Sequence, residues 1–264
     1  FNMSNTTVSY NQTINSLSGA GIVTNLSTAA GTSILTVAGN GTNTTFSGQI
    51  LKGSNLNATT GITALGDIAL VKSGTGTLTL NGTSTYSGGT TINAGTLRVG
   101  SNSALGTGDI TGAGGSLQAF GADVALSNNM TLTGTTGLTV SGSQSLTVSG
   151  TVTGNGSATK TLINNLDPGK LLTLGNVVIN VATGQQALFI TGTGNTTVTG
   201  VISSGGNTTN VLQVTNTGTK IFTGNNTYNG ATSLGNNGVS AGTLQLTGSG
   251  TLGGNSTAGL NVFG

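Results

Sequence analysis

The 264-residue chain contains no cysteine, histidine or tryptophan, and its acidic residues are four aspartates without a glutamate. Without cysteine, neither a disulfide nor thiol chemistry is available. Without histidine or cysteine, a transition-metal site is not expected, and a serine nucleophile lacks its usual general base. Only 4% of the residues are charged and the formal net charge is +2, so no basic patch for nucleic acid is predicted.

Proline, aromatic residues and long apolar runs are also scarce. Pro168 is the only proline, and aromatic residues make up 3% of the chain. No apolar run approaches the roughly 18 residues that a membrane-spanning helix requires. Good helix formers do not accumulate over any helical window, so helices are nearly excluded.

Glycine, threonine, asparagine and serine supply most of the chain, with 48 glycines. Such a composition is compatible with disorder, but disordered chains usually combine high net charge with few β-branched residues. Here Thr, Val and Ile occur in short alternating runs, which suit a pleated and half-buried surface. The sequence therefore predicts an all-β fold.

Two long segments repeat each other. Val71–Gly82, followed by Thr85-Tyr86-Ser87-Gly88, returns as a segment that begins at Val214 and reaches Thr227-Tyr228-Asn229-Gly230; Gly76 and Gly218, like Tyr86 and Tyr228, are 142 residues apart. Further along, Ala94-Gly95-Thr96-Leu97 returns after 147 residues as Ala241-Gly242-Thr243-Leu244. The change of offset predicts a five-residue insertion near 235–240. Tyr86 and Tyr228 are expected to occupy matching places, and so are Leu97 and Leu244.

Short strands separated by Gly and Asn every eight to twelve residues are typical of solenoid rungs, where Gly and Asn supply left-handed corners. A sandwich or closed barrel is the competing architecture, but it usually needs larger core residues between its sheets. We predict a right-handed parallel β-helix (β-solenoid) with about 20–25 residues per rung, which gives roughly a dozen rungs. It is expected to be a single elongated solenoid over 1–264, with two related repeat modules at about 35–111 and 187–253.

The first repeat has a recognisable family pattern. The stretches LVKSGTGTLTLNGTSTYSGGTTINAGTLRVGSNSALGTGDIT (70–111) and LQVTNTGTKIFTGNNTYNGATSLGNNGVSAGTLQL (212–246) resemble the autotransporter-associated β-strand repeat of passenger domains. The following segment, 114–134, has a similar character. The resemblance implies a right-handed β-helix exported to the bacterial surface. In that family the repeat is a scaffold thought to aid secretion and folding, and it supplies no catalytic residues.

Residue patterns that could support chemistry have simpler explanations. Gly238-Val239-Ser240-Ala241-Gly242 matches a nucleophile elbow but falls in the predicted insertion, and Gly169-Lys170 follows Pro168 in an expected loop. The four aspartates, Asp67, Asp109, Asp123 and Asp167, are too scattered to predict the carboxylate pair of a glycoside hydrolase. The recurrence of Gly-Asp-Ile at 66 and 108 is interpreted as a turn signal. No catalytic, cofactor-binding or metal-binding residue is predicted, and the chain is expected not to be an enzyme.

Two surface patterns have both a functional and a structural interpretation. Thr-x-Thr pairs, as at 75/77/79 and 197/199, could form an ice-binding array, but their irregular spacing favours ordinary strand-facing threonines. Asn-x-Ser/Thr sequons such as Asn5-Thr6-Thr7 and Asn195-Thr196-Thr197 are glycosylation acceptors by pattern. A chain this rich in Asn and Thr contains them by chance.

Two functions remain open at this point. One is a non-catalytic structural or adhesive element of the bacterial cell surface that presents loops to a host or neighbouring cell. The other is a subunit of an extracellular filament, formed by homotypic end-to-end contacts. The stretches Phe1–Leu17 and Gly253–Gly264 carry no charged side chain, whereas soluble solenoids usually have polar or charged caps. No cofactor, nucleic-acid partner or membrane-spanning segment is expected.

Overall fold

The computed structural model describes all residues except 5–7, 9, 54–64, 135–136, 182–186, 206–210, 216, 236–241, 254–259 and 263–264. The described residues form short β-strands and contain no α-helix. No helix in this part of the chain is therefore long and apolar enough to cross a membrane. Contacts between Cα atoms divide the chain into two compact units: Phe1–Thr111 with Gly115–Asn128, and Gly112–Gly114 with Asn129–Gly264.

The strands follow one another at short intervals in both units. Those of the N-terminal half are β1 (Gln12–Ile14), β2 (Ile22–Thr24), β3 (Gly31–Val37), β4 (Thr44–Phe46), β5 (Gln49–Leu51), β6 (Gly66–Lys72), β7 (Thr77–Leu80), β8 (Thr90–Ile92), β9 (Thr96–Val99), β10 (Ile110–Gly112), β11 (Ser116–Ala119) and β12 (Val124–Leu126). Those of the C-terminal half are β13 (Met130–Leu132), β14 (Leu138–Gly142), β15 (Leu146–Val148), β16 (Val152–Gly156), β17 (Lys160–Leu166), β18 (Leu171–Leu174), β19 (Val177–Val181), β20 (Ala187–Thr191), β21 (Asn195–Val198), β22 (Ile202–Ser204), β23 (Val211–Val214), β24 (Thr219–Phe222), β25 (Thr232–Leu234), β26 (Thr243–Leu246) and β27 (Leu260–Val262).

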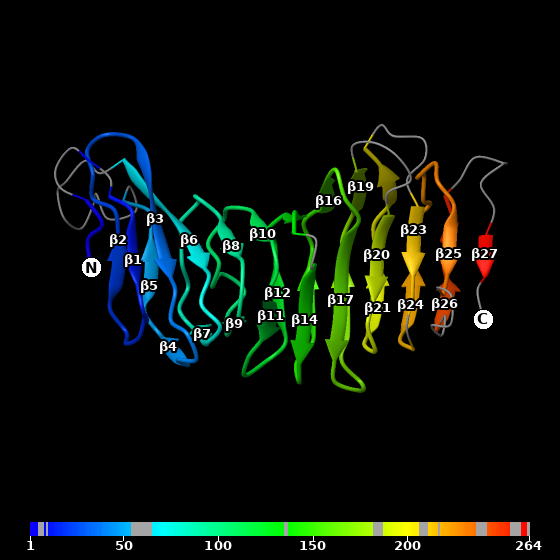
Figure 1. Cartoon of the computed structure of the whole chain (residues 1–264), viewed down its shortest axis with the longest axis horizontal. Coiled ribbons are helices and arrows are strands. Elements are labelled where there is room, and N and C mark those ends of the chain that lie inside the picture. Colours follow the sequence, from blue (N-terminus) through cyan, green and yellow to red (C-terminus); the bar gives the residue numbers. More distant parts are fainter. Residues whose placement is uncertain are drawn as a thin grey trace. The chain divides into compact units, whose positions relative to one another are not determined.

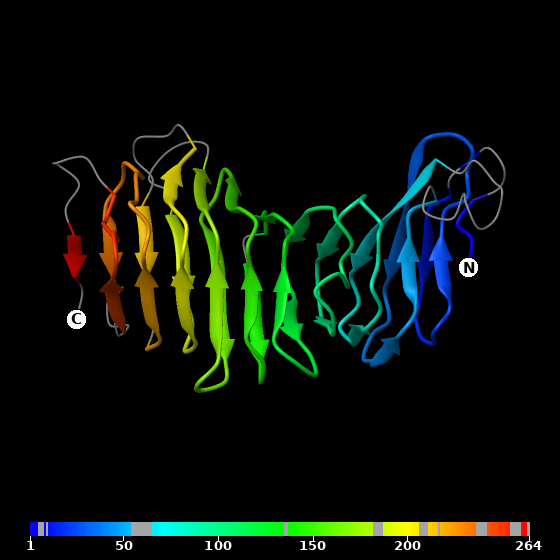
Figure 2. The ribbon, with the colours of Figure 1, turned by 180° about the vertical axis from the view of Figure 1, so that it is seen from behind.

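Within each unit, strands from successive turns pair in parallel and form separate faces (Figure 1). In the first unit the orders are β1-β3-β6-β8-β10, β4-β7-β9-β11 and β2-β5. In the second they are β13-β16-β19-β22, β14-β17-β20-β23-β25-β27 and β15-β18-β21-β24-β26. The view from behind shows the same side-by-side strands in each unit (Figure 2). Sandwiches are built from antiparallel strands, so this parallel pairing confirms a β-solenoid.

The interior of each turn is filled by stacked aliphatic side chains. Leu97 pairs with Leu78 on one side and Leu117 on the other, and all three are completely buried. Residues between them along each strand point outward, because side chains alternate across a strand. Small branched residues fill this narrow interior without aromatic layers. That is why a chain so poor in aromatic residues can fold.

The length of a turn varies more than the sequence analysis predicted. Thr77 pairs with Thr96, 19 residues on, whereas Leu35 pairs with Leu70, 35 residues on. The turns are therefore not uniform in length, and the predicted figure of about 20–25 residues per rung describes only some of the described turns. The single-solenoid organisation of 1–264 and the module bounds, about 35–111 and 187–253, stay predictions.

Asparagine side chains at the corners fasten successive turns together. Asn195 Oδ1 accepts a hydrogen bond from the Thr219 backbone N–H at 3.0 Å, and Asn176 Oδ1 accepts one from Val201 N–H at 3.0 Å. The same contact recurs at seven other described asparagines, namely Asn2, Asn11, Asn43, Asn102, Asn129, Asn165 and Asn226. Several of these N–H groups belong to the first residues of a strand, and each needs an acceptor in a neighbouring turn. This pairing gives the asparagine content a structural role.

Candidate functional site

The two repeat copies each bury a tyrosine in the same way. Tyr86 and Tyr228 are completely buried, and each hydroxyl contacts the threonine four residues further along, Thr90 or Thr232. Burial raises the pKa of both phenols, and the threonine contact opposes that shift. The predicted equivalence of Tyr86 and Tyr228 is therefore confirmed.

The predicted equivalence of Leu97 and Leu244 is confirmed in register. Leu97 pairs with Leu78 and Leu244 with Lys220, which is the residue 142 positions after Leu78. The two leucines differ in burial, since Leu97 is buried and Leu244 is half-buried. The five-residue insertion lies almost wholly in 236–241, outside the described residues.

Three lysines point into the interior, although no sequence pattern distinguishes them from surface lysines. Lys72, Lys160 and Lys220 are all at most 3% exposed. Their ammonium groups reach corner carbonyls: Lys72 donates to Gly74 O and Ala94 O, Lys160 to Thr133 O at 3.0 Å, and Lys220 to Gly192 O at 3.2 Å and Gly194 O at 3.0 Å.

Burial disfavours the charged form of Lys72 and Lys220. It lowers the pKa of Lys72, and it lowers the pKa of Lys220 from 10.5 to about 8. Desolvation is the cause in both cases. Each lysine thus exchanges hydration for hydrogen bonds to carbonyl groups that would otherwise have no donor at the corner.

A glycine at the corner of the first repeat makes the close approach of Lys72 possible. Gly95 has a φ of +67°, and a Cβ atom built on it would lie 2.3 Å from Gly74 O and 2.7 Å from Lys72 Nζ. A side chain cannot fit there. The segments Lys72-Ser73-Gly74 and Ala94-Gly95-Thr96 therefore pack against each other in successive turns.

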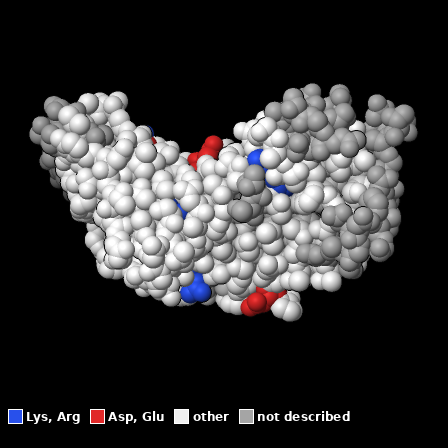
Figure 3. Space-filling model, in the orientation of Figure 1, with Lys and Arg blue, Asp and Glu red and all other residues white. Residues whose placement is uncertain are grey.

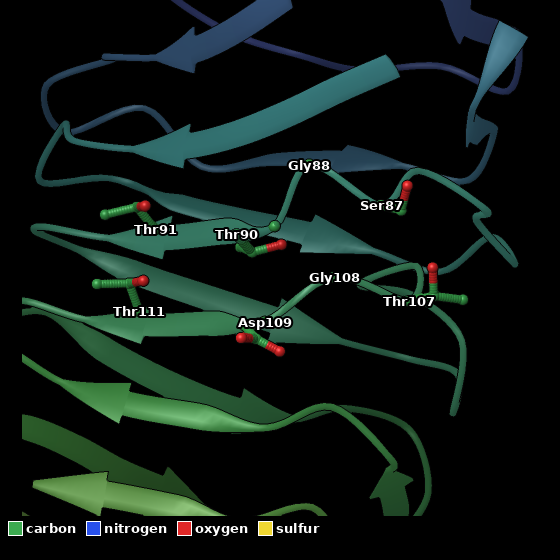
Figure 4. A pocket seen from close by; sticks show the side chains of 9 residues that line it. Ser87, Gly88, Thr90, Thr91, Thr107, Gly108, Asp109 and Thr111 are labelled. Carbon is green, nitrogen blue, oxygen red and sulfur yellow. The ribbon is translucent and has the colours of Figure 1, made fainter. Parts of the chain in front are cut away.

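A polar groove opens on the outer surface of the first unit. It has a volume of about 460 Å³ and lies where two successive turns present glycine at neighbouring positions. Figure 4 shows Thr91 and Thr111 on one side of the glycines and Ser87 and Thr107 on the other, with Asp109 beside Gly108. The remaining lining residues are Gly88, Gly89, Gly108 and Thr90.

An ion pair lies next to this groove. Lys52 Nζ is 3.7 Å from Asp67 Oδ2 and donates to Ser87 Oγ at 3.2 Å. Ser87 in turn donates to Asp67 from its hydroxyl and, at 2.9 Å, from its backbone N–H. Because Lys52 is a donor to the Ser87 hydroxyl, this geometry does not place it as a base for a serine nucleophile.

The second copy has the corresponding backbone contact. Asn229 N–H donates to Ser204 Oγ at 3.0 Å, where the first copy has Ser87 N–H and Asp67. A side chain from the preceding turn therefore holds the residue after the buried tyrosine in both copies. The contact explains the Asp67 cluster as an attachment of one turn to the next.

Residues 70–99 match the family model of the passenger-associated-transport-repeat. These residues contain Lys72, Tyr86 and Gly95, whose contacts are described above. The chain carries a passenger-type transport repeat. No curated protein and no solved structure shows significant similarity to the chain.

The four aspartates of the chain differ in their place in the fold. Asp67 is buried within β6, so the turn interpretation is wrong for this residue; Asp109 directly precedes β10, and Asp123 and Asp167 are exposed. Among the described residues, no group of three or more His, Cys, Asp or Glu side chains could hold a metal ion. The absence of catalytic and cofactor sites stays a prediction.

The other sequence candidates fall into three classes. The Gly238–Gly242 elbow lies in residues outside the described part, except for Gly242. Pro168 and Gly169 form a turn closed by Lys170 N–H to Asp167 O at 3.0 Å, as the loop interpretation predicts. The sequon at Asn195 lies in β21, where Asn195 holds the next turn, and Asn5 lies outside the described residues.

Threonines do align between turns, but only over short distances. Thr147 pairs with Thr173, and Thr173 with Thr197, whereas the next residue in this outward column is Ile221. A Thr-x-Thr array would need two unbroken columns. These registers therefore favour ordinary strand threonines, as the sequence analysis expected.

Proposed function

We propose that the chain is a non-catalytic, structural or adhesive β-solenoid of the bacterial cell surface, exported as part of a passenger-like protein. The observation that carries this proposal is the passenger-type repeat at 70–99, folded into stacked parallel turns. A function in transport and folding fits a repeat whose lysine, tyrosine and glycine are used in internal contacts.

The internal contacts support a mechanical role. Hydrogen bonds join each turn to the next through strand ladders and corner asparagines, so a load along a unit is shared among many bonds. Buried side chains in register add apolar contact between turns. Stacked turns of this kind present outward side chains at regular spacing, which suits a scaffold for surface loops.

The composition of the surface favours binding to cells or polymers over a catalytic function. On the face shown in Figure 3, lysine, arginine and aspartate form isolated spots on a surface of uncharged residues. Asp67, the most buried aspartate, accepts hydrogen bonds from Ser87 and forms an ion pair with Lys52. Hydroxyl and amide groups remain as the main outward chemistry, and they favour hydrogen bonding over proton transfer.

Beads coated with the purified chain test the adhesive role. They should attach to bacterial or epithelial cells more than beads coated with the heat-unfolded chain. Antibody labelling of intact cells that express the native protein should place it at the surface. Intracellular location, or hydrolysis of pectin, dextran or peptides that Asp→Asn changes abolish, would contradict the proposal.

A filament subunit is the second candidate, and the last described strand of one sheet favours it. In β26, Leu246 is 43% exposed, although its register partner Phe222 is completely buried. A parallel strand edge with an exposed apolar side chain can pair with a further strand. Negative-stain imaging of the purified chain separates fibres from single particles.

A further inference from the structure

The groove between the turns at Ser87–Thr91 and Thr107–Thr111 is built from hydroxyl groups in register. Two backbone hydrogen bonds of 2.9 Å, from Thr107 N–H to Tyr86 O and from Thr90 N–H to Asp109 O, align the two turns. Ser87 is thereby stacked on Thr107, and Thr91 on Thr111. The glycines between these two columns leave the floor of the groove as exposed backbone.

One charged side chain, Asp109, lines this groove, and an ion pair lies beside it. The chain has ten charged side chains, and three of them, Lys52, Asp67 and Asp109, contribute to the groove or to the ion pair behind Ser87. Asp109 is exposed at the groove. The groove therefore combines a carboxylate, four hydroxyls and backbone amides within about 460 Å³, a volume typical of small-ligand sites.

Packing requires the glycines of this groove, whereas the repeat pattern allows another residue type at position 109. A Cβ on Gly88 would lie 2.5 Å from Ile68 O, and one on Gly108 would lie 2.4 Å from Gly89 N. Both positions thus require glycine for packing. In contrast, the 147-residue offset of the second copy aligns Asp109 with Ser256, so the repeat pattern does not require an acid there.

We infer that this groove binds a neutral, hydroxyl-rich glycan, with Asp109 accepting hydrogen bonds from adjacent sugar hydroxyls. This inference rests on the proposed adhesive function, because the glycan would be the partner that the adhesive chain binds. The lining offers no apolar platform for a lipid or aromatic ligand. Its acceptors and donors match sugar hydroxyls, each of which can donate and accept.

Binding to a single groove of this kind is expected to be weak. The groove is shallow, and each hydrogen bond to sugar replaces one to water, so the net gain per bond is small. Many copies on one cell surface raise the overall avidity without new contacts. The probe should therefore be presented in multivalent form.

The test uses the full chain on an array of galactose-, mannose-, glucose- and N-acetylhexosamine-terminated oligosaccharides, followed by saturation-transfer NMR with the strongest. We expect at least one neutral glycan to bind. Asp109→Ala should weaken binding at least tenfold, and Thr111→Val about threefold. Asp123→Asn changes another exposed aspartate of the same unit and should leave binding unchanged. Circular dichroism must show the same fold for all variants.

Three results would overturn the inference: no binding to any glycan, binding that Asp109→Ala leaves within twofold, or binding that EDTA abolishes, which would assign Asp109 to a metal. The bead assay separates this failure from that of the proposed function. If beads adhere to cells but no glycan binds, only the groove assignment fails. If a glycan binds but beads adhere to no cell, the adhesive function fails.

Discussion

Tyr86 Oη lies 2.6 Å from Thr90 Oγ1 in the interior of the first repeat copy, and both residues are at most 1% exposed. Removing the phenol hydroxyl leaves the Thr90 hydroxyl buried without this partner. Tyr86→Phe is expected to lower the free energy of unfolding by about 1–3 kcal/mol.

The second copy provides the matched variant, Tyr228→Phe, because Tyr228 contacts Thr232 in the same way. Thermal melts of the two variants should show losses of similar size. An unchanged melting temperature for both would mean that the buried hydroxyl pair contributes nothing to stability.

The interior lysines and tyrosines predict an unusual dependence of stability on pH. Between pH 8 and 10.5 the folded state loses the Lys220 proton while the unfolded state keeps it, so stability should rise with pH in this window. Above pH 10 the unfolded tyrosines ionise, whereas burial holds Tyr86 and Tyr228 neutral in the fold, so stability should fall.

Melting temperature measured from pH 7 to 11 should therefore pass through a maximum near pH 10. Lys220→Met should reduce the rise between pH 8 and 10, since one of the two buried lysines with a lowered pKa is gone. Lys170→Met, at a half-buried position after the Pro168 turn, serves as the control and should keep the rise. A melting temperature that falls steadily from pH 8 would be the opposite result.

Corner asparagines should differ in importance according to burial. Asn226 is 5% exposed; its Oδ1 accepts from Ile202 N–H at 2.7 Å and its Nδ2 donates to Thr251 O at 2.5 Å. Asn226→Ala should cost about 1–3 kcal/mol because buried partners lose their hydrogen bonds. Asn195 is exposed, so Asn195→Ala should cost only about 0.5–1 kcal/mol. Urea unfolding measures both, and equal costs would contradict the argument from burial.

The corner at Gly95 predicts a strong steric effect. Gly95→Ala combines a φ of +67° with a Cβ 2.3 Å from Gly74 O, and should cost more than about 2 kcal/mol. Gly121 has a similar φ of +79° but nothing within 4 Å of its Cβ position. Gly121→Ala should therefore cost only about 1 kcal/mol, from backbone strain alone. Chemical unfolding that gives similar losses for both would remove the steric explanation.

The fold could be predicted because its signals are local. Short alternating strands and corner Gly or Asn recur at close intervals, and the two tyrosines mark equivalent places in the copies. The length of each turn could not be predicted in this way. Register steps range from 19 residues between Thr77 and Thr96 to 35 between Leu35 and Leu70, and no residue pattern marks this difference.

The groove depends on register, which the repeats in the sequence did not reveal. Gly66-Asp67-Ile68 and Gly108-Asp109-Ile110 look identical, yet Leu70 pairs with Thr90 and thereby sets Asp67 beside Ser87. Thr90 N–H donates to Asp109 O, which sets Asp109 beside Gly89 instead. The interior lysines were missed for a related reason, because a sequence does not show that corner carbonyls converge on an inward-pointing side chain.

The filament alternative leads to a test at the last described strands of the sheets. β26 and β27 are the last described strands of their sheets, and Leu246 in β26 is 43% exposed. Pairing with another chain would satisfy edge N–H and C=O groups at a net gain of roughly 0.5–1.5 kcal/mol per hydrogen bond, plus apolar burial. With ten charged residues in the chain, little charge repulsion opposes stacking, so association should be insensitive to salt.

Sedimentation velocity at increasing concentration should then show elongated oligomers of the unmodified chain. Leu246→Lys places a charge on the exposed edge, and Val262→Pro removes a donor from β27, so each should favour the monomer. Val262→Thr keeps the strand donor and serves as the control, with association retained. A chain that stays monomeric at high concentration, whichever variant is compared, would instead support a single surface stalk, because edge pairing would then contribute no measurable association.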